Sequence, residues 1–177
     1  MNRQRARLFA CLLLFGLPAP ALSDELPTGV MPVADMPAPP LQLDNIDSEA
    51  YDLAQTGGHW RFVHFWASWC GPCRREMPVI QRLLPLIADR DIEVVLVNTA
   101  ETEDEVFTFL GIVAPDLVPL LDVDGLVTQA WQPRVLPAPF LVDPDGQTRY
   151  QALGGRSWDE PPYVEFLQGL GENPDPE

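Results

Sequence analysis

Two cysteines three residues apart, Cys70 and Cys73, are the residues of this chain whose type and spacing best support a chemical reaction. They follow Trp69, and Pro72 between them suits an early helical position, where its missing N–H costs nothing. The N-terminal end of a helix favours a thiolate over a thiol, and the thiolate is the species that attacks disulfides. We therefore expect Cys70 to be a nucleophile and Cys73, one turn farther on, to resolve the mixed disulfide.

Other uses of this cysteine pair fit the sequence less well. A disulfide between Cys70 and Cys73 closes a very short loop and restrains the unfolded chain little, so it is a poor structural staple. Zinc needs four ligands, or three and water, and only His59 and His64 could be added. A haem attachment motif needs histidine where Arg74 stands. We expect no metal and no organic cofactor.

The first 23 residues are typical of a secretory signal peptide. Three arginines precede an apolar run at 8–17, and a small-x-small pattern ends at Ser23. The run is shorter than the roughly 20 residues that span a bilayer, and an uncleaved membrane anchor is the alternative. Cleavage after Ser23 would remove Cys11, leave one cysteine pair, and place the protein in the periplasm, an oxidising compartment.

The composition limits the classes of partner. The chain of 177 residues is 46% hydrophobic, enough for one domain with a core, and its formal net charge is −15. Such an acidic chain is repelled by nucleic acid and by anionic lipid. A basic protein partner stays possible, although an acidic surface also simply keeps a protein soluble.

The patterns of apolar residues predict one α/β domain at residues 41–170. It follows a flexible, proline-rich linker at 24–40 and precedes a disordered tail at 171–177. The order of elements indicates a central mixed β-sheet flanked by helices. Strands are expected at 41–43, 51–53, 61–67, 92–97, 118–121, 140–142 and 147–153, and helices at 71–87, 102–110, 126–131 and 158–170.

The sequence FWASWCGPCRREMP at residues 65–78 resembles the active-site strand and helix of thioredoxin-fold proteins. The wider pattern resembles the TlpA branch of exported thiol–disulfide oxidoreductases. The resemblance covers residues 39–170 and includes, in order, LQLDNIDSEAYDL, the WCGPC helix, IEVVLVN, LPAPFLVDPDG and GGRSW. It implies a thioredoxin fold with an N-terminal extension, acting on disulfides of other exported proteins. It also implies a membrane thiol donor that regenerates the reduced form, and we expect a monomer.

Further site residues follow from this resemblance. Pro137 corresponds to the family's cis-proline, which lies beside the two sulfurs. The backbone of Leu136 would then pair with an extended substrate segment, a short form of strand addition. Trp69, Gly71 and Pro72 are expected to complete this substrate groove.

His64 lies six residues before Cys70, where thioredoxins commonly carry a buried aspartate that helps to move protons at the resolving cysteine. An imidazole can take such an acid–base role, and the alternative is a core histidine with a satisfied hydrogen bond. Arg74, Arg75 and Glu76 follow the motif and are expected to be solvated or paired at the helix surface.

The direction of electron flow is left open by the residues. The Gly-Pro dipeptide between the cysteines resembles that of reducing thioredoxins and favours a reductase. A disulfide oxidase or isomerase is one alternative, because the poise of the compartment also sets direction. A binding module that uses the fold without turnover is another.

Overall fold

The structure is a computed structural model that describes residues 26–171. The predicted signal peptide, its cleavage site and nearly all of the polar tail therefore lie outside the described residues. Among residues 26–171, no helix is both long enough and apolar enough to cross a bilayer.

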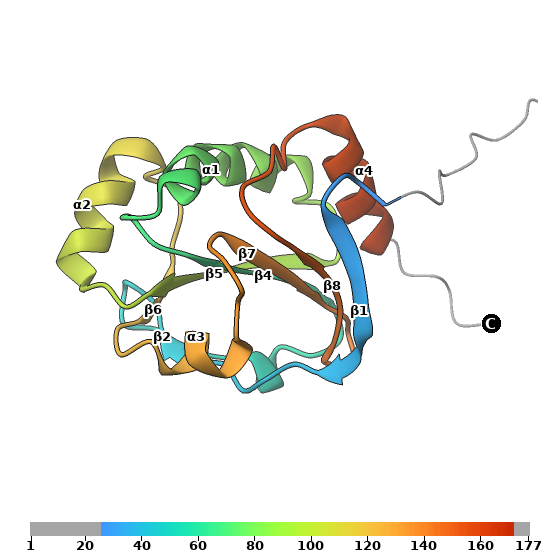
Figure 1. The fold of residues 1–177 in the computed structure, drawn as a ribbon, viewed down its shortest axis with the longest axis horizontal. Coiled ribbons are helices and arrows are strands. Elements are labelled where there is room, and N and C mark those ends of the chain that lie inside the picture. The colour runs from blue at the N-terminus through green and yellow to red at the C-terminus, as the bar shows by residue number, and fades with distance from the viewer. Residues whose placement is uncertain (1–25, 172–177) are drawn as a thin grey trace, which may run out of the picture.

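A six-stranded mixed sheet forms the centre of the molecule, in the order β1-β8-β7-β4-β5-β6 (Figure 1). Strands β4, β5 and β6 are parallel, while β7, β8 and β1 join the other edge of β4 in antiparallel fashion. A separate hairpin joins β2 and β3. The strands are β1 Val30–Pro37, β2 Gln42–Asp44, β3 Ala50–Asp52, β4 Trp60–Trp66, β5 Ile92–Thr99, β6 Leu120–Asp122, β7 Ala138–Val142 and β8 Gln147–Ala152.

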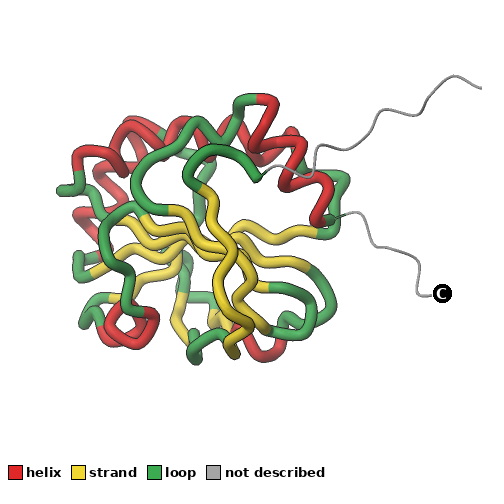
Figure 2. Tube along the Cα trace, turned by 45° about the vertical axis from the view of Figure 1, so that its right-hand side comes forward, coloured by secondary structure: helices red, strands yellow, loops and turns green. Residues whose placement is uncertain are grey.

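Helices cover both faces of this sheet (Figure 2). Helices α1 (Gly71–Leu83), α2 (Glu103–Val113) and α4 (Pro161–Leu170) lie on one face, and α3 (Leu126–Trp131) lies with the β2–β3 hairpin on the other. Successive side chains of a strand point to opposite faces. Phe62 and Trp66 of β4 thus enter the α1 core, whereas Val63 and Phe65 enter the second core.

The predicted fold class is confirmed. Most boundaries shift by one to four residues, and three of these shifts have a clear physical reason. Helix α4 begins at Pro161 rather than 158, with proline in its first turn, where its fixed φ suits a helix. Strand β6 begins at Leu120, because Pro119 offers no N–H to a ladder. Helix α2 starts after Thr102, whose backbone and hydroxyl both donate to Glu105 and lower the pKa of that carboxyl.

The expectation of a flexible linker at residues 24–40 is wrong for its central part. Val30–Pro37 form strand β1, which pairs with β8 and covers that edge of the sheet. Val30 is buried, and the Tyr163 hydroxyl of α4 donates to the carbonyl of Thr28. Prolines are tolerated here because an edge strand uses only some of its N–H groups.

Strand β1 supplies a stability test with a matched control. Val30 is 6% exposed and Met31 is 41% exposed, so the two neighbours point to opposite sides of the strand. Val30→Ser should lower the free energy of unfolding by about 2 kcal/mol, the scale of burying one aliphatic side chain. Met31→Ser should stay within about 0.5 kcal/mol. Chemical denaturation measures both, and equal, negligible effects would restore the linker interpretation.

Candidate active site

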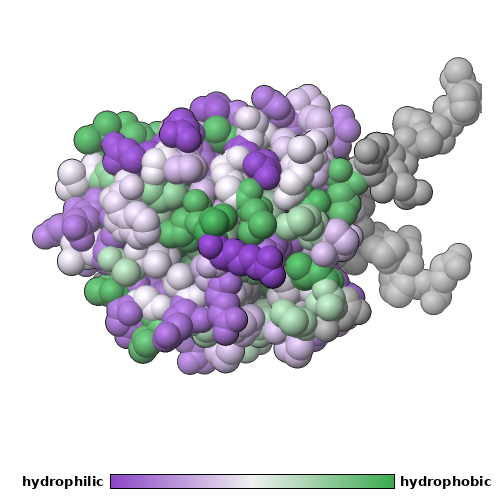
Figure 3. All heavy atoms as spheres, in the orientation of Figure 1, coloured by the Kyte–Doolittle hydropathy of each residue, from purple (hydrophilic) through white to green (hydrophobic). Residues whose placement is uncertain are grey.

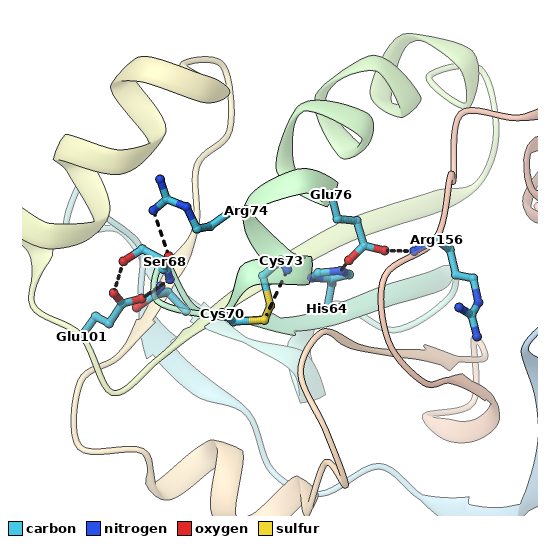
Figure 4. The surroundings of a disulfide bond; sticks show 9 residues. His64, Ser68, Cys70, Cys73, Arg74, Glu76, Glu101 and Arg156 are labelled. Atoms are coloured by element: carbon cyan, nitrogen blue, oxygen red, sulfur yellow. Dashed lines mark hydrogen bonds and ion pairs between the residues drawn. A yellow bond between two sulfur atoms is a disulfide. The ribbon is translucent and has the colours of Figure 1, made fainter.

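Cys70 and Cys73 form a disulfide at the start of α1, where β4 ends (Figure 4). Their sulfur atoms are 2.10 Å apart. Cys70 is the N-cap of α1 and its sulfur accepts a hydrogen bond of 3.3 Å from the backbone N–H of Cys73. Cys70 is 7% exposed and Cys73 is fully buried. Solvent and partner proteins therefore reach Cys70 first, in the order that an attacking and a resolving cysteine require.

A buried carboxylate holds the loop that leads into Cys70. Glu101 accepts hydrogen bonds from the backbone N–H of Ser68 at 2.6 Å and from the Ser68 hydroxyl. The Asn98 side chain donates to the same carboxylate at 2.7 Å. On the other side, Arg74 donates to the Ser68 carbonyl at 3.1 Å. Fixing Ser68 in this way presents the next residue, Trp69, to solvent with 64% of its surface exposed.

Pro137 lies at the edge of the sheet that carries the disulfide. The Leu136–Pro137 peptide bond is cis. Strand β7 begins at the next residue, and Ala138 pairs with Phe65 near the end of β4, which places Pro137 beside the β4–α1 connection. Gly155 closes the gap between Pro137 and Pro72. A Cβ at Gly155 would lie 3.6 Å from the Pro72 carbonyl oxygen and 3.9 Å from Cγ of Pro137.

Beneath the disulfide, His64 and Glu76 form a buried ion pair or hydrogen bond. His64 Nε2 lies 3.0 Å from Glu76 Oε2, and both side chains are almost completely inaccessible to solvent. The other carboxylate oxygen of Glu76 accepts the Trp158 indole N–H at 2.7 Å and the Arg156 backbone N–H at 2.8 Å. Figure 4 shows the His64 ring beside Cys73, between the disulfide and Glu76. Isolated buried charges are costly, and these donors offset the desolvation of the carboxylate.

The proton on His64 can be assigned from its partner. An ionised carboxylate only accepts hydrogen bonds, so Nε2 of His64 carries a proton when it faces Glu76. Nδ1 is then the nitrogen that remains available. It is buried and has no hydrogen-bond partner within residues 26–171. A carboxylate that orients an imidazole and leaves its second nitrogen free is the arrangement of an acid–base pair.

The structure brings Cys70, Cys73, Pro137 and His64 together at the carboxyl-terminal edge of the sheet, near the end of the inner strand β4, with Trp69 beside them. Leu136, Gly71 and Pro72 also lie at this edge. One expectation is wrong, because Glu76 is 2% exposed and does not pair at the surface. Its burial was readable from helical spacing, since Cys73, Met77 and Ile80 define the buried face of α1 and Glu76 lies on that same face.

Glu101 and Trp158 are two further site residues that the sequence analysis did not single out. Glu101 follows the buried strand β5, and Trp158 lies in the loop after β8. Glu101 accepts a hydrogen bond from Ser68 in the loop before α1, and Trp158 donates one to Glu76 in α1. The two residues of each pair are more than thirty positions apart in the sequence. No local pattern marks them.

Comparison with known proteins places this geometry in a family. Residues 32–167 match the family model described as Redoxin. The thiol–disulfide oxidoreductase ResA of Bacillus subtilis is 29% identical over 110 residues, which cover 62% of each chain. ResA of Geobacillus kaustophilus is 30% identical over 120 residues, covering 66% of this chain and 67% of the relative. The aligned region thus spans 62% of the length of the B. subtilis relative.

Solved structures show the same fold. A protein assigned as the thiol:disulfide interchange protein DsbE of Chlorobium tepidum is 27% identical, with a TM-score of 0.68, covering 77% of this chain and 97% of that one. StoA from Bacillus subtilis superposes with a TM-score of 0.63 at 22% identity, covering 76% and 98% of the two chains. With its CxxC pair on a thioredoxin fold, this chain belongs to the redoxin family and to its TlpA-like members in the thioredoxin superfamily.

Proposed function

We propose that this protein is an exported thiol–disulfide oxidoreductase that reduces disulfides in other exported proteins. The observation that carries the proposal is the sulfur of Cys70 at the N-cap of α1, reachable by a partner, with Cys73 buried one turn behind it. The family supports the same chemistry, since the relatives that match are thiol–disulfide oxidoreductases.

The reaction balances as two successive exchanges. In the reduced protein, the Cys70 thiolate attacks one sulfur of the substrate disulfide, the substrate S–S bond breaks, and one substrate thiolate leaves and takes up a proton. The Cys73 thiolate then attacks the Cys70 sulfur and releases the second substrate thiolate. The substrate gains two electrons, and the protein is left with the Cys70–Cys73 disulfide that the structure shows. A thiol donor on the membrane would return those electrons.

His64 is our candidate for the proton acceptor of the second exchange. Cys73 is fully buried, so its proton needs an acceptor inside the protein when it becomes a thiolate. Nδ1 of His64 has no hydrogen-bond partner among the described residues, and Glu76 orients the ring. Pro137 and Leu136 would align the substrate beside Cys70.

The cysteine roles predict different outcomes for the two serine variants. Cys70→Ser should reduce insulin no faster than the uncatalysed background, because no nucleophile remains. Cys73→Ser should still attack but should accumulate a mixed disulfide with its substrate, because the resolving thiol is lost. Turbidity and non-reducing electrophoresis measure the two results. If the wild type also reduced insulin no faster than the background, a binding module would be the better interpretation.

The direction of transfer is tested by the reduction potential of the pair. The Gly-Pro dipeptide between the cysteines resembles that of reducing thioredoxins, which lack the strongly stabilised reduced form of an oxidant. Strong oxidants owe their potential to a stabilised reduced form, so we expect a value near the roughly −270 mV of a reducing thioredoxin. Equilibration with glutathione or dithiothreitol buffers measures it. A value near −120 mV would make the protein an oxidase.

The role of His64 is tested by the pH dependence of resolution. His64→Asn keeps a donor for Glu76 but removes the imidazole that would accept the proton. Positioned acid–base groups contribute roughly 10²–10⁴-fold, so the decay of a preformed mixed disulfide should slow about 100-fold at neutral pH, while the first attack by Cys70 is unchanged. His59→Asn is the control, because His59 lies just before the start of β4, and the disulfide lies beyond the other end of that strand. Folding is checked by thermal denaturation, and an unchanged pH profile in His64→Asn would refute the role.

A further inference from the structure

The charge of this acidic protein is divided unevenly along the chain. Segments 60–84, 126–142 and 146–158 contain most of the arginines and a single carboxylate, Glu76. The segments 42–52 and 101–105 contain carboxylates and no arginine. Such a division matters only if the fold gathers the three basic segments in one place.

The fold brings one part of each segment to the disulfide, whereas Arg61, Arg82 and Arg149 lie elsewhere on these segments. Segment 60–84 supplies β4 and α1 with both cysteines, and 126–142 supplies the cis-proline and β7, which pairs with β4. The third segment contributes Gly155, which packs against Pro72 and Pro137. A depression of about 390 Å³ lies at this junction and is lined by Pro72, Arg75, Val79 and Arg156, among others.

Glu76 also lines this depression, but its charge is directed inward. Its two oxygens accept hydrogen bonds from His64, Trp158 and the backbone of Arg156. Among residues 26–171, Arg75 and Arg134 have no carboxylate partner, whereas Arg82 and Arg149 pair with Asp159 and Asp143. Nη1 of Arg75 lies 3.8 Å from the position that a Cβ on Gly71, between the two cysteines, would occupy. Arg134 is exposed in the segment that leads to Pro137.

Exposed apolar side chains accompany these charges. Trp69, next to Cys70, and Val135, two residues before Pro137, are 64% and 50% exposed. Figure 3 shows hydrophobic and strongly hydrophilic residues side by side in the middle of the face that it draws, over the segment that leads into β7. We call Trp69, Pro72, Arg75, Arg134 and Val135 the redox face.

We propose that the redox face selects substrates whose disulfide lies in an acidic, extended segment. The inference rests on the proposed function and adds the chemical class of its substrate. Arginine binds carboxylates through paired, directional hydrogen bonds, and Trp69 offers the aromatic contact typical of binding hot spots. The screening length is about 8 Å at physiological salt, so the arginines beside the disulfide act on a bound segment more strongly than carboxylates beyond that distance. The two carboxylates nearest the motif, Glu76 and Glu101, are buried and hydrogen-bonded.

The experiment compares three disulfide-linked peptide dimers of equal length, with the cysteine flanked by Glu, Ser or Lys. Each is reduced by the reduced full-length protein, and each rate is divided by the rate with dithiothreitol, which removes intrinsic differences between the disulfides. At low ionic strength, steering by charge is worth about tenfold or more. The Glu dimer should therefore react at least about tenfold faster than the Lys dimer, and 0.5 M salt should narrow the gap.

Charge reversal identifies the residues responsible. Arg75→Glu and Arg134→Glu should abolish or invert the preference for the Glu dimer over the Lys dimer, with each rate divided by the rate of the same variant on the Ser dimer. Arg82→Glu, on the same helix, makes the same charge change at a side chain already paired with Asp159 at 2.7 Å, and should keep the preference. Equal normalised rates for the Glu and Lys dimers, or a faster Lys dimer, would overturn the inference. If no dimer is reduced at all, the proposed function fails instead.

Discussion

The buried carboxylate of Glu76 joins the parts of the molecule that must cooperate around the disulfide. It comes from α1, and its partners are His64 of β4, Trp158 and the backbone of Arg156 in the β8–α4 loop. Removing one partner of a buried charged pair typically costs about 3–5 kcal/mol, because the other charge is left uncompensated. One side chain therefore ties the helix that bears the cysteines to the sheet and to the closing loop, in addition to the apolar packing of that helix.

Two carboxylates with different partners lie at the two ends of the segment from Ser68 to Cys73. Glu101 fixes Ser68 and with it the exposed Trp69, while Glu76 lies behind Cys73. Both are buried and hydrogen-bonded, so neither carboxylate is presented to a docking substrate. An acidic protein thus presents arginine and apolar side chains at its reactive edge, because its carboxylates there are turned inward.

Much of the fold was predictable because its signals are local. β-branched and aromatic runs marked β4 and β5, and α3 at Leu126–Trp131 was predicted with its observed limits. The proline content of residues 30–37 indicates a linker. These residues form strand β1 only because they pair with β8, whose other side is already paired with β7. The charge of Glu76 favours a place at the helix surface, but its spacing from Cys73, Met77 and Ile80 puts it on the buried stripe of α1.

The sequence by itself determined the reactive pair. A spacing of three residues at a helix start brings Cys73 one turn behind Cys70, whatever the rest of the chain does. Only the tertiary structure decided what surrounds that pair. The pairing of His64 with Glu76, the place of Pro137 beside the β4–α1 connection and the meeting of three arginine-bearing segments all join residues distant in sequence. Such contacts depend on sheet order and loop packing, which no local pattern encodes.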